Sequence, residues 1–469
     1  MSSQVLIDRR LVAGRETDGW APARELPPRF AVDAHRPELA GDFPRDGLRV
    51  AAFSPLGNRE LKSVPDCRCS PLAGSVVGMS LSYEFTAPRR IVLGSGRRKD
   101  LGTLVAPLGR RVFLLPGSRV LEQHGELQGA IDRLRQAHLE VIPLETVTHE
   151  PTVADVDRVV TAIRSHQPQG TDLLLALGGG SAIDLAKAAA AVVAHPEVEG
   201  ISRFLEGTPE KIELTREVLP IVAVPTTAGT GSEATRNGVI SSPEQRAKRS
   251  IRSERLLPRL VLVDPELTLS LPPKVTAATG LDAITQLIES YISRRATPLS
   301  RMLVLQGLPG TCDALRTACR EGGHLPSREI LAQAALLSGL ALANSGLGLA
   351  HGVAAALGVH ANVSHGLACA VMLPAALRYN LDCKTDDLAT LSWLLLGPTA
   401  ESPRQAAQRL IDTLEILLLE LQIPSQLREL GVRHEQLPDL VRDSRGNSLN
   451  GNPRDVSEAE LREVLESVW

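Results

Sequence analysis

Asp282 and Gln286 lie four residues apart on one face of a predicted helix whose other positions are largely apolar. A carboxylate among core positions is costly unless a hydrogen bond, a charged partner or a metal ion compensates for its burial. A local contact between Asp282 and Gln286 would brace the helix, and a chemical role for Asp282 is the alternative. These residues alone leave both interpretations open.

A second candidate site begins where an apolar, strand-like run ends in Gly178, Gly179 and Gly180 and a helical pattern follows from Ser181. Glycine permits close approach of the backbone to a pyrophosphate, and the free N–H groups and positive dipole at a helix start favour that anion. We therefore assign Gly179, Gly180 and Ser181, with Asp184 in the same segment, to cofactor binding. A tight turn between strand and helix would explain the glycines equally well.

A cluster of hydroxyl groups follows another strand-like run, in the stretch VPTTAGTGSE. It contains Thr226, Thr227, Thr230 and Ser232 around two glycines. Hydroxyl groups in this number suit hydrogen bonds to ribose and phosphate, whereas a plain turn needs only one or two of them. We predict that these four residues also contact the cofactor.

The elements that must position these residues change in type along the chain. Near-continuous apolar strands alternate with amphipathic helices over residues 79–270, which predicts a parallel sheet covered on both faces. Residues 271–469 show helical patterns almost throughout. The sequence therefore predicts an α/β domain followed by an all-α domain. The predicted strands are 110–116, 141–145, 172–180, 219–225 and 259–265.

Residues 1–78 differ from the remainder, because they are rich in Pro and Arg and lack sustained apolar periodicity. We predict a mostly disordered extension here. Met79, just before the ordered pattern begins, is a candidate for the true translation start, and a genuine regulatory tail is the alternative.

Composition narrows the class of protein. The chain has 469 residues, 43% of them hydrophobic, and a net charge of −3, with a pI near 6.4. Dispersed Lys and Arg give no basic footprint for nucleic acid or an anionic membrane, so we expect small-molecule partners. The apolar runs are too short to span a bilayer, and the first residues do not resemble a secretory signal. Six scattered cysteines fit a reducing compartment, so we expect a cytoplasmic protein.

Several blocks in order along the chain resemble the iron-containing (group III) alcohol dehydrogenases over Tyr83 to Trp469. The blocks are GGGSAIDLAK, PTTAGTGSE, LVDPELTLSLPP, TAATGLDAIT, GLAHGVAAALGVHANVSHG and GNPR. The resemblance implies a Rossmann-like dinucleotide-binding domain, a helical domain, a metal in the cleft between them, and a homodimer. The cofactor would be NAD or NADP.

The resemblance also implies a metal site with one departure. In that family an Asp, a His four residues later, and two His fourteen residues apart hold the metal. The acid matches Asp282, the later histidines match His351 and His365, and the second position holds Gln286. A neutral amide is a weaker ligand than imidazole for a transition metal. We expect one Fe(II) or Zn ion on Asp282, His351 and His365, with Gln286 as a weak fourth ligand or as a group that holds a water.

A second departure concerns the proton path. The family often has another His four residues after the first cleft His, and this chain has Ala355 there. His360 is close in sequence and is a candidate replacement, with a purely structural role as the alternative. Lys248 matches the family lysine that approaches the nicotinamide ribose, and one more cation in a basic loop is its alternative.

The turn after the strand at 110–116 bears on cofactor choice. NAD-preferring relatives typically carry an Asp there that accepts hydrogen bonds from the adenosine ribose and repels a 2′-phosphate. This chain has Gly117, Ser118 and Arg119, so we expect NADP to be tolerated or preferred. An Arg119 that simply points to solvent is the alternative.

The implied reaction is reversible hydride transfer between an alcohol and an aldehyde or ketone, with the metal as a Lewis acid. Three alternatives remain. One is a metal-independent reductase that resembles maleylacetate reductases. Another is a relative of dehydroquinate synthase or glycerol dehydrogenase. The last is a non-catalytic nucleotide-binding protein whose metal site has decayed through Gln286 and Ala355.

Overall fold

The computed structural model describes residues 82–244 and 247–469. These residues belong to one compact unit, so sheet and helices are described together. The extension predicted at residues 1–78 lies outside the described residues. The change from sheet to helices falls between a short 3-10 helix at Pro265–Thr268 and helix α6 (Pro273–Ile292).

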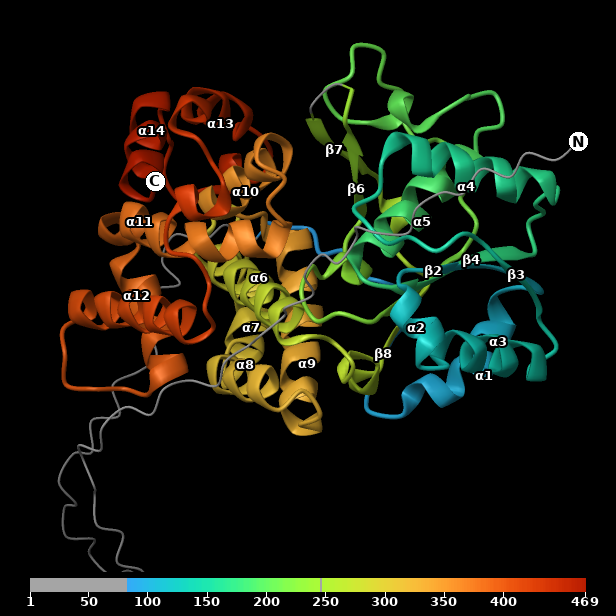
Figure 1. The fold of residues 1–469 in the computed structure, drawn as a ribbon, viewed down its shortest axis with the longest axis horizontal. Helices are drawn as coiled ribbons and strands as arrows, with labels where there is room; N and C mark the ends of the chain where they lie inside the picture. The colour runs from blue at the N-terminus through green and yellow to red at the C-terminus, as the bar shows by residue number, and fades with distance from the viewer. Residues whose placement is uncertain (1–81, 245–246) are drawn as a thin grey trace, which may run out of the picture. The chain divides into compact units, whose positions relative to one another are not determined.

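A six-stranded parallel sheet forms the first half of the described chain (Figure 1). Its strands, in spatial order, are β1 (Ile91–Leu93), β8 (Leu260–Val263), β5 (Ile221–Pro225), β4 (Asp172–Gly178), β2 (Arg111–Pro116) and β3 (Glu140–Pro143). The five strands predicted from apolar runs are confirmed, with bounds shifted by a few residues. The edge strand β1 was not predicted, because it has only three residues.

Helices cover both faces of the sheet because neighbouring strand residues point to opposite sides. Phe113 and Leu115 of β2 pack with α4 (Val153–Ser165) and α5 (Gly180–Val193). Val112 and Leu114 of the same strand pack on the other face with α1 (Leu101–Val105) and α3 (Glu126–Gln136). Figure 1 shows the sheet between these two helical layers.

The connections create a crevice at the carboxyl ends of β2 and β4. After β2 the chain passes through α2 (Arg119–Gln123) and α3 to the edge strand β3, then returns through α4 to β4 on the other side of β2. Chains that leave two neighbouring strands in opposite directions leave space for a ligand between them. Gly117 and Gly178 lie at this point, and a Cβ on Gly117 would be 2.6 Å from the Gly178 Cα.

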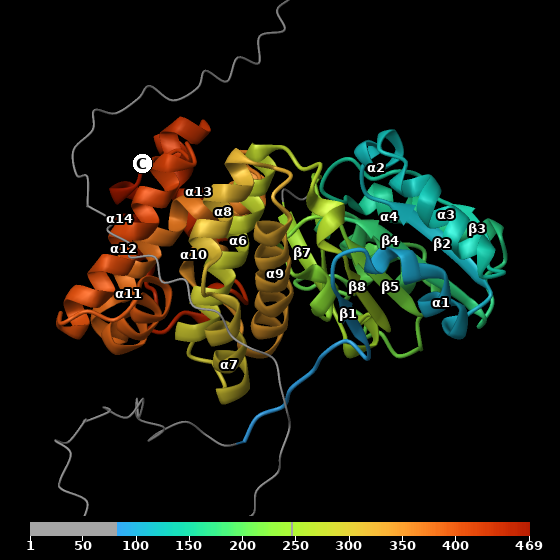
Figure 2. The same ribbon diagram turned by 90° about the horizontal axis from the view of Figure 1, so that it is seen from below.

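The second half is helical, as predicted. Its helices after α6 are α7 (Pro298–Gly307), α8 (Thr311–Arg320), α9 (Leu325–Ser345), α10 (Leu349–His360), α11 (His365–Leu396), α12 (Pro403–Glu420), α13 (Leu437–Asp443) and α14 (Glu458–Ser467). Helix α6 contributes Leu281, Ile284, Leu287 and Ile288 to the main helical core. In Figure 2, α9 faces the α/β part.

Two segments show structure that the sequence patterns did not indicate. Lys248 lies in strand β7 (Ala247–Arg252), paired antiparallel with β6 (Asn237–Ser242), and not in a loop, which was the alternative for this residue. The segment between β2 and β3 contains two helices, α2 and α3, separated at Gly125, whose φ of 74° suits glycine.

Within the described part of the chain, no single helix is long and apolar enough to cross a membrane. Helices α9 and α10 together reach the required length and composition, but they are bent by 101° at the break between them.

Candidate active site

A cavity of about 390 Å³ is lined by residues from the sheet part and from the helical part. The predicted site residues that line it are Gly180, Ser181, Asp184, Thr230, Ser232, Lys248, Gln286, His351 and His365. The remaining predicted residues, which do not line it, are Gly117, Ser118, Gly179, Thr226, Thr227, Asp282 and His360. The structure therefore brings the glycine-rich turn and two of the histidines to one space.

The start of helix α5 is suited to an anion. Gly179 is its N-cap residue, and no side chain caps the helix. Gly180 and Ser181 at this end line the cavity, so their N–H groups and the helix dipole are presented to a ligand there. A pyrophosphate would satisfy the groups that a capping side chain normally satisfies.

The turn after β4 packs against the loop after β5. A Cβ on Gly180 would lie 2.6 Å from Oγ1 of Thr230, and one on Gly179 would lie 3.1 Å from Oγ1 of Thr227. The glycines thus serve the contact between the two loops as well as access to the cavity. A bulky residue at Gly180 would displace Thr230. A weaker cofactor affinity in such a variant could therefore result from the displaced loop as well as from a blocked binding site.

Asp184 and Ser232 are committed to each other. The Ser232 hydroxyl donates a short hydrogen bond to the Asp184 carboxylate, which also accepts the backbone N–H of Val239 at 3.1 Å. Both residues line the cavity, but these contacts fix the β5 loop and strand β6 against α5. Their contribution to a cofactor site is therefore partly architectural.

Lys187, a turn further along α5, is fully buried and holds the same loop. Its Nζ donates to the backbone oxygens of Ser232, Thr235 and Asn237 at 2.6 to 2.9 Å. Burial lowers the pKa of Lys187 to about 8, while the nearby carboxylates Asp184 and Glu233 act to raise it.

Ser118 and Lys248 lie at opposite ends of the predicted cofactor path. Ser118 is the N-cap of α2, where its Oγ accepts the N–H of Val120 at 3.1 Å. Lys248 lines the cavity and forms a 2.5 Å ion pair with Glu150, which lines it as well. The hairpin of β6 and β7 therefore presents Lys248 to the cavity with its charge balanced by Glu150.

Four side chains that could ligate a metal lie close together, and two of them, His351 and His365, line the cavity. One ligand atom each of Asp282, His351, His365 and Cys369 lies within 4.8 Å of the others. Nε2 of His351 is 3.3 Å and Nε2 of His365 is 3.9 Å from Oδ1 of Asp282. Gly366 permits this approach, because a Cβ there would be 2.9 Å from the carbonyl carbon of Ala278 on α6.

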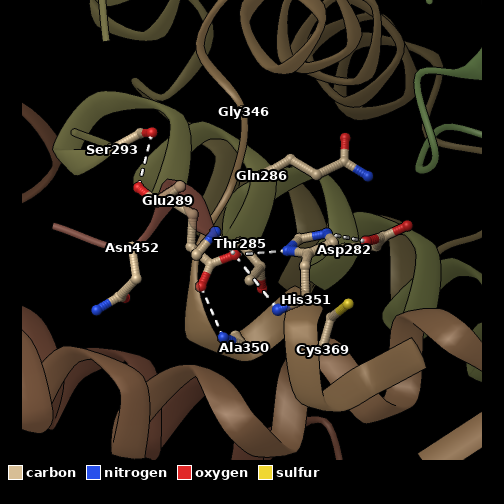
Figure 3. A network of polar contacts seen from close by, with 12 residues as sticks. Asp282, Thr285, Gln286, Glu289, Ser293, Gly346, Ala350, His351, Cys369 and Asn452 are labelled. Atoms are coloured by element: carbon tan, nitrogen blue, oxygen red, sulfur yellow. Dashed lines mark hydrogen bonds and ion pairs between the residues drawn. The ribbon is translucent and has the colours of Figure 1, made fainter. Parts of the chain in front are cut away.

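Glu289, two turns after Asp282 on α6, orients His351. Its Oε2 is 2.7 Å from Nδ1 of His351, and the carboxylate accepts the backbone N–H groups of Gly348 and Ala350 at the start of α10. With Nδ1 donating to Glu289, Nε2 of His351 is directed at Asp282 and would become the metal-binding nitrogen once its proton is lost. In Figure 3 the His351 ring lies between Glu289 and Asp282.

Gln286 is held between two partners. Its Oε1 accepts a 2.6 Å hydrogen bond from Ser338 of α9, and its side chain also contacts the Asp282 carboxylate. The amide thus braces Asp282, as one of the two interpretations of the sequence expected. Its oxygen is engaged away from the cluster.

The buried carboxylates of the cluster favour positive charge on the imidazoles beside them. Burial acts to lower the pKa of His351, but Cys369, Asp282 and Glu289 raise it well above its usual value. Burial acts to raise the pKa of Asp282, but His365, His351 and Gln286 lower it below its usual value, so it stays ionised. The charge of Cys369 raises the pKa of His365 to about 9 against desolvation, with a further contribution from Asp282. A divalent ion could take the place of the imidazole protons here, because one carboxylate and two imidazoles are common ligands of catalytic metals.

His360 lies at the end of α10, where its Nε2 is 2.7 Å from Oδ2 of Asp443. Asp443 lines the cavity and His360 does not. The structure therefore places His360 behind a carboxylate at the rim, and its role in a proton path stays a prediction.

Sequence reasoning missed Glu289 and Cys369. Both carried a readable signal: Glu289 follows Asp282 by two helical turns, and Cys369 follows His365 by one turn, so each shares a helix face with a predicted ligand. The GNPR block, in contrast, is structural. Asn452 exchanges hydrogen bonds with Asn380 of α11 at 2.9 and 3.0 Å.

Comparisons with known proteins agree with this geometry. The iron-containing alcohol dehydrogenase family matches residues 88–265, and the C-terminal Fe-containing alcohol dehydrogenase family matches residues 276–469. A 1,3-propanediol dehydrogenase of Klebsiella pneumoniae is 34% identical over 392 residues, which are 82% of this chain and 99% of the relative. An NADPH-dependent butanol dehydrogenase of Clostridium saccharobutylicum is 30% identical, covering 82% and 97%.

A solved structure shows the same fold. The crystal structure of a 1,3-propanediol oxidoreductase aligns with a TM-score of 0.77 at 32% identity, covering 83% of this chain and all of that one. Both halves of the described chain and the whole length of these relatives are matched. The chain therefore belongs to the iron-containing alcohol dehydrogenase family and is a nicotinamide-dependent oxidoreductase that interconverts alcohols and aldehydes.

Proposed function

We propose that Asp282, His351 and His365 hold one divalent ion, Fe(II) or Zn, and that NAD(P) extends from the start of α5 to this ion. The observation that carries the proposal is that Gly180 and Ser181 line the same cavity as His351 and His365. A hydride can pass directly only when donor and acceptor carbons are held in contact, which a shared cavity permits.

The donor set fits a metal ion. Nε2 of His351 and Oδ1 of Asp282 face each other at 3.3 Å, so a divalent ion would take the place of the proton that these two atoms share. Asp282, His351 and His365 would hold the ion, which would supply Lewis-acid chemistry toward a substrate oxygen. Glu289 fixes the His351 ring, and Gln286 steadies Asp282 while Ser338 holds its oxygen.

The cavity wall near the cluster supports a short aliphatic substrate. Leu342, Leu347, Gly346 and Ala355 line the cavity together with Gln286, and these side chains are small or apolar. Small and apolar walls favour an unbranched carbon chain whose one polar end faces the metal ligands. The relatives named for 1,3-propanediol and butanol act on alcohols of this kind.

Cofactor choice, cellular location and oligomeric state complete the proposal. The turn after β2 has Ser118 where NAD-preferring relatives have a carboxylate. Because no negative charge there would repel a 2′-phosphate, we propose that NADP is accepted as well as NAD. In the described part of the chain all four cysteines are free, which supports the predicted cytoplasmic location. The homodimer stays a prediction from the resemblance.

Metal analysis combined with a turnover assay tests the proposal. Purified protein should contain one Fe or Zn per chain and should oxidise NADH or NADPH in the presence of propanal or butanal. Chelation should abolish turnover, and the added metal should restore it. Full activity in metal-free protein would instead support the metal-independent reductase, and nucleotide binding without turnover on any aldehyde would support the non-catalytic alternative.

A further inference from the structure

Cys369 stands where a fourth metal ligand is needed. It lies on α11 one turn after His365, fully buried, with its Sγ 3.7 Å from Nε2 of His365. Figure 3 shows its sulfur directed toward Asp282 and His351. Because residues four apart share a helix face, α11 presents an imidazole and a thiol to the same point.

Three separations between donor atoms are close to those of a tetrahedral site, and all four donor atoms lie within 4.8 Å of one another. Around one zinc ion with bonds of about 2.1 Å to nitrogen or oxygen and about 2.3 Å to sulfur, tetrahedral angles place N and O about 3.4 Å apart and N and S about 3.6 Å apart. The observed N–O separations are 3.3 and 3.9 Å, and the observed N–S separation is 3.7 Å. One ion can therefore reach these donors with only small movements.

Other buried thiols in the helical part have no such surroundings. Cys312 and Cys319 belong to the main apolar core, and burial raises the pKa of each thiol to about 11. They behave as small hydrophobic residues that keep their protons. Cys369 differs because its polar neighbours are an ionised carboxylate and two imidazoles that already converge.

We propose that the Cys369 thiolate is the fourth protein ligand of the metal, in the position that Gln286 leaves empty. The inference rests on the proposed metal site. Gln286 is directed to Ser338 and Asp282, so its oxygen does not compete for the ion. On binding, the ion takes the place of the thiol proton, which passes to water, and no electron transfer is involved.

Ligand chemistry favours this set. An anionic thiolate is a stronger ligand than a neutral amide for a buried divalent ion, because it compensates more of the ion's charge directly. A thiolate also favours zinc over harder ions that prefer oxygen ligands. The chain would thus have exchanged an imidazole on α6 for a thiolate on α11.

Cobalt substitution of the full-length protein tests the thiolate directly. Co(II)-loaded wild type should show a near-ultraviolet thiolate-to-cobalt charge-transfer band. Cys369→Ser should lose this band and bind Co(II) at least about tenfold more weakly, as expected when a metal-site contact is lost. Cys383→Ser removes an exposed thiol outside the cluster and should keep both band and affinity.

A double variant separates ligand loss from misfolding. Gln286→His combined with Cys369→Ser should regain much of the Co(II) affinity without regaining the thiolate band, because an imidazole then supplies the fourth donor. One bound Co(II) without a thiolate band in wild type would overturn the inference and return the fourth position to Gln286, leaving the proposed metal function intact. A wild-type protein that binds no Co(II), Zn or Fe would overturn both.

Discussion

At the scale of single residues, the site depends on buried charges that have assigned partners. Glu289 accepts hydrogen bonds from three backbone N–H groups at the start of α10 and from Nδ1 of His351, so it both caps a helix and fixes one ring. Glu233 lies in an equally buried place beside Lys187 and Asp184. The two carboxyl groups lead to different predictions. Glu289 orients the proposed metal ligand His351, whereas ionisation of the buried Glu233 lowers the stability of the folded protein near neutral pH.

Glu289→Gln should weaken metal binding. The amide keeps the size of the side chain but removes the charge that holds the proton on Nδ1 of His351, so Nε2 becomes a poorer ligand. We expect the zinc affinity to fall by about 10- to 100-fold, measured by competition with a chromophoric chelator. Glu254→Gln, at an exposed ion pair with Arg236, is the control. Unchanged affinity with a lower melting temperature would show that Glu289 only caps α10.

Glu233→Gln should stabilise the protein above neutral pH. Burial raises the pKa of Glu233 from 4.5 to about 7, so the folded state binds more protons than the unfolded state between these values. Wild-type stability should therefore fall as pH rises through this window, and the penalty, at most about 3 kcal/mol, should persist above it. Melting temperatures at pH 5 and pH 8 test this. The variant should exceed wild type at pH 8 by more than at pH 5; an equal offset at both would contradict the explanation.

At the scale of elements, the two halves meet where backbone approaches backbone. Gly231, with φ 61°, lies within the hydroxyl-rich loop, between Thr230 and Ser232, and contacts Gly339 in the middle of α9. At the other end of the cofactor path, Ser118 begins α2 as its N-cap. A substitution at Gly339 tests the packing of α9 against this loop, and a substitution at Ser118 tests cofactor choice while the helix cap is kept.

Gly339→Ala should destabilise the protein although alanine is the better helix former. The new Cβ would lie 2.7 Å from the Gly231 Cα, and such overlap costs about 1–3 kcal/mol, more than the roughly 1 kcal/mol that alanine contributes to a helix. Gly129→Ala in α3 is the matched control, because its new Cβ would meet only the flexible end of Arg133. Denaturant unfolding should give opposite signs for the two. A stabilising Gly339→Ala would show that α9 does not press on this loop.

Ser118→Asp should shift preference from NADP toward NAD. Aspartate is as good an N-cap as serine, so α2 should begin unchanged while a carboxylate now faces any 2′-phosphate. The ratio of kcat/KM for NADPH over NADH should fall at least about tenfold, and Ser118→Asn should leave it near wild type. Gly117→Asp would be a poor test, because its Cβ would overlap Gly178. A ratio unmoved by Ser118→Asp would place the adenosine ribose elsewhere.

At the scale of the whole molecule, sequence patterns were informative wherever structure is local. Apolar runs marked the five longer strands of the sheet, and the helical periodicity after residue 270 marked the second half. The charged stretch around Lys248 hid a strand, because its alternating residues are only half buried. Local patterns also say nothing of how Cys369 meets Asp282 or how Gly231 meets Gly339, since these contacts arise from helix packing.

The candidate site was foreseeable in part. Asp282, His351 and His365 came from the resemblance, and the structure gathers them in one cluster. The role of Gln286 could not be decided from sequence, because it depends on Ser338 of another helix. The same holds for Ser118, whose capping bond becomes visible only when the start of α2 is known.

The central claim is that the side chains of Asp282, His351 and His365 share one catalytic metal ion. Anomalous diffraction from crystals of the protein purified with its own metal tests it most directly. The account predicts a single strong peak about 2.0–2.3 Å from Oδ1 of Asp282 and from Nε2 of His351 and His365. A fully active protein whose crystals show no peak at this cluster would contradict it.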